Sequence, residues 1–245
     1  MLPASKLAIN ATFNRNLLGL SWREHLQLVS QAKIARSIWV PSSRMQAKVL
    51  RPRSPYVKRQ AMRANFVRVS KFNLVNFYSL ETAPLSQVRT FRFIQEIIGE
   101  NKPYDQTSLY ASIMRGAPLT RYLTSDMDPA QMQKLPIGSE AEFQKYYERC
   151  LALAESIQQN GLQESEFEIQ AICVAIDKGG RFLHLAKGNH RLAIALCLGL
   201  DRIPVRVMSI EGTYFRQFLN RRVITPQHLL SAITTSVETA EKGIS

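Results

Sequence analysis

Long apolar runs are missing from this sequence, and cysteine is scarce. No apolar stretch approaches the roughly 20 residues that a membrane-spanning helix needs, and the first residues lack the apolar core of a secretion signal. We therefore expect a cytoplasmic protein without a membrane span. Cys150, Cys173 and Cys197 are far apart, and each falls in an apolar helix or strand pattern. Such a pattern predicts buried thiols rather than disulfides or metal ligands.

The familiar motifs of metal and nucleophilic chemistry are also missing. The histidines are isolated in sequence, so we expect no metal site. Neither a Walker-type glycine-rich loop nor a strained nucleophile elbow is present. We interpret His184, which falls in a strand pattern, as a packed residue rather than a catalyst. The catalytic residues of any activity therefore stay unknown at this point.

Acidic residues are absent between Glu24 and Glu81, and the whole chain carries a net charge of +13. A basic run of this kind attracts polyanions, which include nucleic acid, an acidic membrane surface and an acidic protein. Alternatively, the segment is solvated and lies against the more acidic remainder of the same chain. The sequence leaves both interpretations open. The basic residues of this interval are Lys33, Arg36, Arg44, Lys48, Arg51, Arg53, Lys58, Arg59, Arg63, Arg68 and Lys71.

Three parts are expected along the chain. Residues 1–62 form a basic helical extension and an arm, residues 63–212 form the core domain, and residues 213–245 form C-terminal helices. Within the first part, a capping-box pattern at Ser21 predicts a helix that runs to about Trp39. Prolines and basic residues then predict an irregular arm over 42–56.

The start of the core shows mixed patterns. Residues 66–80 are strand-prone, and residues 84–98 have the apolar spacing of a helix. Asp105 is the expected N-cap of a further short helix, although it could instead line a substrate site with Thr107 and Tyr110. Turn-forming residues over 115–137 predict a long loop. An amphipathic helix follows, on the apolar residues Phe143, Tyr146, Tyr147, Cys150, Leu153, Ala154 and Ile157.

The most informative stretch is the turn Lys187-Gly188-Asn189-His190-Arg191. It follows a predicted strand over 169–176, a hairpin turn at 177–180 and a return strand over 181–187. Asn189 is the expected N-cap of the apolar helix that comes next, and residues 203–208 form one more strand. A helix that begins here offers backbone N–H groups and the positive end of its dipole, while His190 and Arg191 add donors. The turn therefore either holds an anion such as phosphate or is a plain strand-to-helix turn with Arg191 facing water.

A family resemblance favours the phosphate interpretation. Gly188-Asn189-His190-Arg191, the apolar helix, Leu198-Gly199-Leu200-Asp201 and residues 203–207 together resemble the second signature box of the ParB/sulfiredoxin superfamily. Residues 153–162 resemble the first box, a helix that ends at a glycine. The resemblance covers residues 151–208 and implies an α+β fold, with a ParB/sulfiredoxin-like core and added N-terminal and C-terminal helices. It also implies that the Gly-x-x-Arg turn, here Gly188 and Arg191, cradles nucleotide phosphates.

The resemblance also bears on activity. Sulfiredoxins carry a reactive cysteine inside this turn, whereas this chain has Asn189, so sulfiredoxin chemistry is not expected. Some relatives are nucleotide-dependent kinases of small molecules such as free serine, which implies a Mg-bound nucleoside triphosphate and a small hydroxyl substrate. Phosphoryl transfer needs a carboxylate, and Glu81, Asp105 and Asp177 are available. Whether the chain is an enzyme stays open. The alternative is a nucleic-acid-binding protein that uses the basic N-terminal region.

Overall fold

The computed structural model describes residues 38–49, 64–68, 74–77, 82–117, 119–122, 134–163, 171–185, 187–218 and 226–242. Three sequence predictions lie outside these ranges: most of the helix begun at Ser21, the arm beyond residue 49, and the carboxylate candidate Glu81. In the part of the chain that is described, no helix combines the length and the apolar character needed to cross a membrane.

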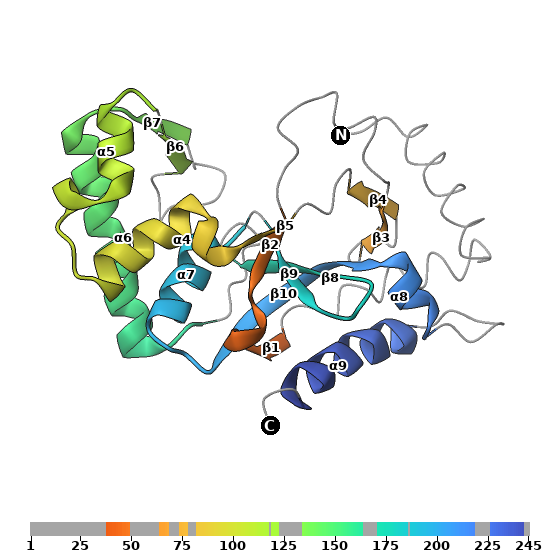
Figure 1. Cartoon of the computed structure of the whole chain (residues 1–245). Coiled ribbons are helices and arrows are strands. Elements are labelled where there is room, and N and C mark those ends of the chain that lie inside the picture. The colour runs from red at the N-terminus through yellow and green to blue at the C-terminus, as the bar shows by residue number, and fades with distance from the viewer. Residues whose placement is uncertain are drawn as a thin grey trace.

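A mixed sheet of eight strands lies at the centre of the protein (Figure 1). The strands follow the order β4-β3-β10-β8-β9-β2-β5, and β1 pairs with β10 beside this path. The pairs β8–β10 and β2–β9 are parallel, and the other pairs are antiparallel. The bounds are β1 Ile38–Pro41, β2 Ala47–Val49, β3 Ala64–Arg68, β4 Leu74–Phe77, β5 Thr82–Pro84, β8 Ile172–Ile176, β9 Phe182–His184 and β10 Arg202–Glu211.

Helices lie on opposite sides of β10 in Figure 1, with α4 to α7 on one side and α8 and α9 on the other. The bounds are α4 Arg89–Ile94, continued by a π turn over Gln95–Gly99, α5 Ser108–Met114, α6 Glu140–Asn160, α7 Asn189–Cys197, α8 Gly212–Arg216 and α9 Pro226–Lys242. A second, two-stranded sheet pairs β6 Leu119–Tyr122 with β7 Lys134–Ile137. The expected combination of helices and strands is therefore confirmed, as a mixed α/β protein.

Helix α6 forms where the sequence predicts an amphipathic helix. Ser139 and Glu142 make a reciprocal capping box at its start, and Gly161 follows its last residue with φ of 71°. The apolar stripe faces the core, because Phe143, Tyr146, Cys150, Ala154 and Ile157 are all buried. This stripe packs α6 beside α7, which positions the turn that precedes α7.

The strand, hairpin, helix and strand predicted for this part of the chain are confirmed within the described residues 171–185 and 187–208. All five residues of β8 are buried, as expected of a central strand with helices nearby. Four consecutive residues of α7, from Leu192 to Ala195, are buried as well, so α7 is covered on more than one side. Strand β9 and helix α7 together connect the parallel strands β8 and β10.

Four local predictions are wrong. Residues 38–41 form β1 instead of the end of a helix, and Ala47–Val49 forms β2 within the segment predicted to be irregular. Thr107 rather than Asp105 caps α5, since its Oγ1 accepts a hydrogen bond from the amide of Tyr110. The predicted loop 115–137 contains β6 and β7. The strands form because each pairs with another segment, whereas Thr107 caps its own helix locally.

Candidate functional site

Gly188 fixes the shape of the turn before α7. It is the N-cap residue and has φ of 73° and ψ of 22°, in the left-handed region that favours glycine. A Cβ atom at this position would lie 2.6 Å from the carbonyl oxygen of Ala171 and 2.6 Å from Cα of Ile172. Both the conformation and the close approach to β8 therefore require glycine here.

Helix α7 begins at Asn189, so the predicted N-cap is displaced by one residue. Because the N-cap is a glycine, no side chain caps this end of the helix. The first amides of an α-helix have no carbonyl partner within the helix, and the helix dipole adds partial positive charge at the same place. Lys187 precedes the N-cap and is half-buried. The start of α7 therefore combines helix N–H groups with a cationic residue.

A second lysine reaches this turn from a distant part of the chain. The Nζ atom of Lys48, on β2, donates a hydrogen bond of 2.5 Å to Oδ1 of Asn189, the first residue of α7. The pairing of β2 with β9 places Lys48 opposite His184, just ahead of the turn. An ammonium group on the helix side of the turn raises the local positive potential, which attracts anions.

His190 and Arg191 are both anchored to the region of α6. The hydroxyl oxygen of Tyr146 lies 2.6 Å from Nε2 of His190, in a hydrogen bond whose donor depends on the tautomer of the imidazole. Nη2 of Arg191 donates to the backbone carbonyl of Gln163, just beyond the end of α6. That bond takes one of the five N–H donors of the guanidinium. Burial lowers the pKa of Arg191 from its ordinary value, but an arginine of this kind stays charged.

His184 stabilises the turn through a hydrogen bond to the backbone of Lys187. It is fully buried, its Nε2 atom lies 2.8 Å from the carbonyl oxygen of Lys187, and Phe91 makes an edge contact with its ring. Since a carbonyl only accepts, Nε2 carries the proton and Nδ1 is the bare acceptor. Nδ1 is buried and has no hydrogen-bond partner. Burial, with a smaller contribution from Lys48, lowers the pKa of His184 to about 4, so the ring is neutral at pH 7.

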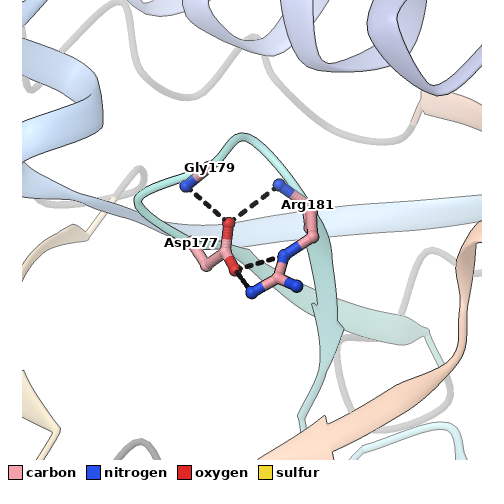
Figure 2. Close-up of polar contacts among 3 residues, drawn as sticks. All are labelled: Asp177, Gly179 and Arg181. Atoms are coloured by element: carbon pink, nitrogen blue, oxygen red, sulfur yellow. Dashed lines mark hydrogen bonds and ion pairs between the residues drawn. The ribbon is translucent and has the colours of Figure 1, made fainter.

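The two described carboxylate candidates lie elsewhere. Asp177 is buried at the tip of the β8–β9 hairpin, where its Oδ1 accepts hydrogen bonds of 2.8 Å and 2.9 Å from the amides of Gly179 and Arg181. Its Oδ2 accepts from the guanidinium of Arg181, as Figure 2 shows. Asp105 lies exposed in a short 3-10 turn, Tyr104–Gln106. Asp177 therefore stabilises the hairpin turn rather than facing the start of α7.

The structure thus assembles around the predicted turn several residues that sequence reasoning missed. Lys48, Tyr146 and Gln163 come from β2, from α6 and from the segment after α6. No local pattern marks them, because each reaches the turn through tertiary packing. The strand pattern of His184 predicted a packed histidine, which its complete burial confirms.

No further site is marked by clustered metal ligands: the described ranges contain no group of three or more histidine, cysteine, aspartate and glutamate residues that could hold a metal ion. Comparison of the chain with protein-family models, with curated proteins and with solved structures found no match in any of the three.

Proposed function

We propose that the chain binds the phosphate groups of a nucleotide at the start of α7. The observation that carries this proposal is the hydrogen bond from Lys48 to Asn189, which places a cation from a distant strand beside the N-terminus of α7. Phosphate binding uses backbone N–H groups and cationic side chains in the same way. The proposed ligand contacts are the first amides of α7, the ammonium of Lys48 and the guanidinium of Arg191.

The order of elements supports the nucleotide as the source of the phosphate. Helix α6, the β8–β9 hairpin, the glycine turn, α7 and β10 follow one another over 140–211, and the two boxes of the ParB/sulfiredoxin resemblance fall on α6 and on the glycine turn with α7 and β10. We therefore extend the proposal to a ParB/sulfiredoxin-like core. Sulfiredoxin chemistry is outside the proposal, because Asn189 takes the place of the reactive cysteine and instead accepts the bond from Lys48.

Calorimetric titration of the full chain with ATP, ADP and CTP, each with Mg²⁺, tests this function. We expect saturable binding of at least one nucleotide, and a loss of about tenfold or more in affinity for Arg191→Ala. Arg181→Ala is the matched control, since Arg181 is an exposed arginine in the hairpin turn, away from α7. Absence of binding, or equal affinity of wild type and Arg191→Ala, would contradict the proposal.

The resemblance extends the proposal to phosphoryl transfer from ATP to a small hydroxyl substrate. A bound Mg²⁺ would neutralise charge on the phosphates, and the residues of the turn would position them. The three buried carboxylates of the described residues, Glu96, Asp177 and Glu211, all accept hydrogen bonds from nearby backbone amides. Glu81, outside the described residues, is then the carboxylate to test. ADP release with free serine as acceptor should fall in Glu81→Gln and persist in Glu142→Gln, whose side chain only caps α6.

A second candidate function follows from the interval without acidic residues between Glu24 and Glu81. Arg44 and Lys48 of this interval are used within the fold, where they bind Ala240 and Asn189. Arg51, Arg53, Lys58 and Arg59 lie outside the described residues and are the ones to test. If they bind nucleic acid, replacing all four by Gln weakens binding and lowers the slope of log affinity against log salt by about 3 to 4. An unchanged slope would contradict this function.

A further inference from the structure

Tyr146 and His190 form a hydrogen-bonded pair that connects α6 to the start of α7. The hydroxyl oxygen of Tyr146 lies 2.6 Å from Nε2 of His190, and the two rings meet edge to face with their centroids 5.6 Å apart. His190 is the second residue of α7 and is half-buried. The pair therefore fixes one edge of the imidazole against α6, within the helical turn that we propose to bind phosphate.

The core of the protein holds Tyr146 in place. Its ring stacks on Phe93 with a centroid distance of 5.3 Å and lies tilted against Phe143 at 6.0 Å. Tyr146 itself is buried, and both phenylalanines are fully buried. Close packing among large rings leaves a side chain little freedom to change its rotamer. The hydroxyl of Tyr146 is therefore a fixed point that sets the orientation of the His190 ring.

The chemistry of this pair favours one tautomer of the imidazole. In a neutral imidazole one ring nitrogen carries the proton and the other is a bare acceptor. A phenol O–H is a stronger donor than the N–H of a neutral imidazole, and the bare ring nitrogen is a good acceptor. Tyr146 therefore donates to Nε2 of His190. The hydrogen bond at one ring nitrogen determines which nitrogen is protonated, so the proton of the ring lies on Nδ1.

Covalent geometry keeps Nδ1 of His190 close to the beginning of the helix. Nδ1 is bonded directly to Cγ, whereas Nε2 lies on the far side of the ring and is engaged by Tyr146. Nδ1 thus stays nearer than Nε2 to the backbone of the first turn of α7, whose amides have no carbonyl partner within the helix. A donor at this place acts together with those amides and with Arg191 on the oxygen atoms of a phosphate.

We propose that Tyr146 is a positioning residue of the nucleotide site: its hydroxyl holds the imidazole of His190 in the tautomer and orientation in which Nδ1–H donates to a phosphate oxygen. This inference rests on the function proposed above and extends it to the side chain of His190. Tyr146 acts through His190 and does not contact the ligand. Orienting a donor before the ligand arrives reduces the entropy that is lost on binding, and this increases the affinity.

Tyr146→Phe removes the hydroxyl and keeps the ring that packs in the core. Calorimetric titration of the full chain with the tightest-binding of ATP, ADP and CTP, each with Mg²⁺, should show binding about fivefold weaker than in wild type. Tyr147→Phe is the matched control and should bind as wild type does, since the neighbouring hydroxyl on α6 donates to the backbone carbonyl of Lys102. His190→Ala should lose at least as much affinity as Tyr146→Phe. The double variant Tyr146→Phe/His190→Ala should bind no more weakly than His190→Ala alone, because Tyr146 acts only through the imidazole.

The ring nitrogens of His190 supply a readout that a purely structural role of Tyr146 would not change. Long-range ¹H–¹⁵N correlation spectra of the ¹⁵N-labelled full chain distinguish a protonated ring nitrogen from a bare one, and they need no ligand. The spectra should be recorded at pH 8, where a histidine is ordinarily neutral. We expect a protonated Nδ1 and a bare Nε2 in wild type, and a mixture of both tautomers in Tyr146→Phe. The resonances of His190 are those that disappear in His190→Ala.

The outcomes separate this inference from the function on which it rests. If wild type binds no nucleotide, both are overturned. If binding weakens in Arg191→Ala but is unchanged in Tyr146→Phe, only the role of Tyr146 is overturned. A bare Nδ1 in wild type, or a double variant that binds more weakly than His190→Ala, overturns that role as well. If Tyr146→Phe does not fold, the tautomer in wild type and the affinity of His190→Ala decide, and wild-type affinity in His190→Ala counts against the inference.

Discussion

The ammonium of Lys48 lies 2.5 Å from the side-chain oxygen of Asn189, although the two residues are 141 positions apart in sequence. This bond links the basic N-terminal interval to the start of the helix that we propose to bind phosphate. It also gives Asn189 a role that differs from capping, because Asn189 is the first helical residue and holds a cation in place. The importance of Lys48 can be measured directly.

Lys48→Met should weaken nucleotide binding about tenfold, since it removes one cation from the proposed phosphate site and retains an apolar stem of similar length. Calorimetric titration with the nucleotide that binds wild type most tightly provides the measurement. Lys145→Met is the control, because Lys145 lies exposed on α6. Equal losses for the two variants would indicate a general charge effect and would count against a role for Lys48 at the site.

Gly188→Ala should lower the free energy of unfolding more than Gly199→Ala does. Both glycines have positive φ, 73° and 66°, so each substitution carries the strain of a left-handed backbone, about 1 kcal/mol. At Gly188 the new Cβ would also meet the backbone of Ala171 and Ile172, whereas no atom lies within 4 Å of it at Gly199. We expect a further loss of about 2 kcal/mol or more at Gly188, measured by urea unfolding. Similar losses would show that β8 moves to accommodate the methyl group.

Burial of His184 should make stability depend on pH. Its pKa in the folded protein is about 4, below the ordinary value of 6.5, so the unfolded chain binds more protons between these values. The contribution of the neutral ring to stability is complete above pH 6.5 and is lost as the pH falls towards 4. At pH 5 the loss amounts to about 2 kcal/mol.

His184→Gln provides the comparison for this prediction, because a glutamine can still donate to the carbonyl of Lys187 but does not titrate. The free energy of unfolding of both proteins should be measured at pH 7 and at pH 5. We expect the wild type to lose more stability than the variant over this interval. Parallel losses in the two proteins would mean that His184 does not cause the dependence.

The two partners of the hairpin ion pair should differ in their effect on stability. Asp177→Ala leaves the amides of Gly179 and Arg181 without their acceptor, and we expect a loss of about 2 kcal/mol. Arg181→Ala should change stability by less than about 1 kcal/mol, because 78% of the Arg181 side chain is exposed. Thermal unfolding of both variants checks the order. A larger loss for Arg181→Ala would assign the stability of the hairpin to the ion pair instead.

The sequence predicted those elements whose signal is local. The apolar stripe of α6, the hairpin turn at Asp177 and the glycine before α7 each depend on neighbours within a few residues. The strands β1 and β2 were missed because their partners are remote: Ile38 pairs with Val205, and Lys48 pairs with His184. Strands β1 and β2 have only four and three residues, so Pro41 in β1 and Lys48 in β2 are enough to make the local pattern irregular.

The residues of the candidate site also fall into two groups: those that a local sequence pattern marks and those that only tertiary packing brings to the turn. Gly188 and Arg191 belong to one contiguous turn, so a pattern of spacing was enough to select them. Lys48 and Tyr146 carry no such mark, because a lysine in a basic interval and a tyrosine on an apolar stripe have ordinary local explanations. Arg44 was one of many basic residues in the sequence, and only its hydrogen bond to Ala240 of α9 distinguishes it.

Strand β10 pairs with β1, β3 and β8, and it therefore joins the first described strand of the chain to the middle of the sheet. During synthesis on the ribosome, β1 and β3 leave the exit tunnel long before β10 does. Until β10 emerges, neither of them can take its final place beside it. Assembly of the sheet is therefore a late event in translation, and a nascent chain stalled before Arg202 would lack its central strand.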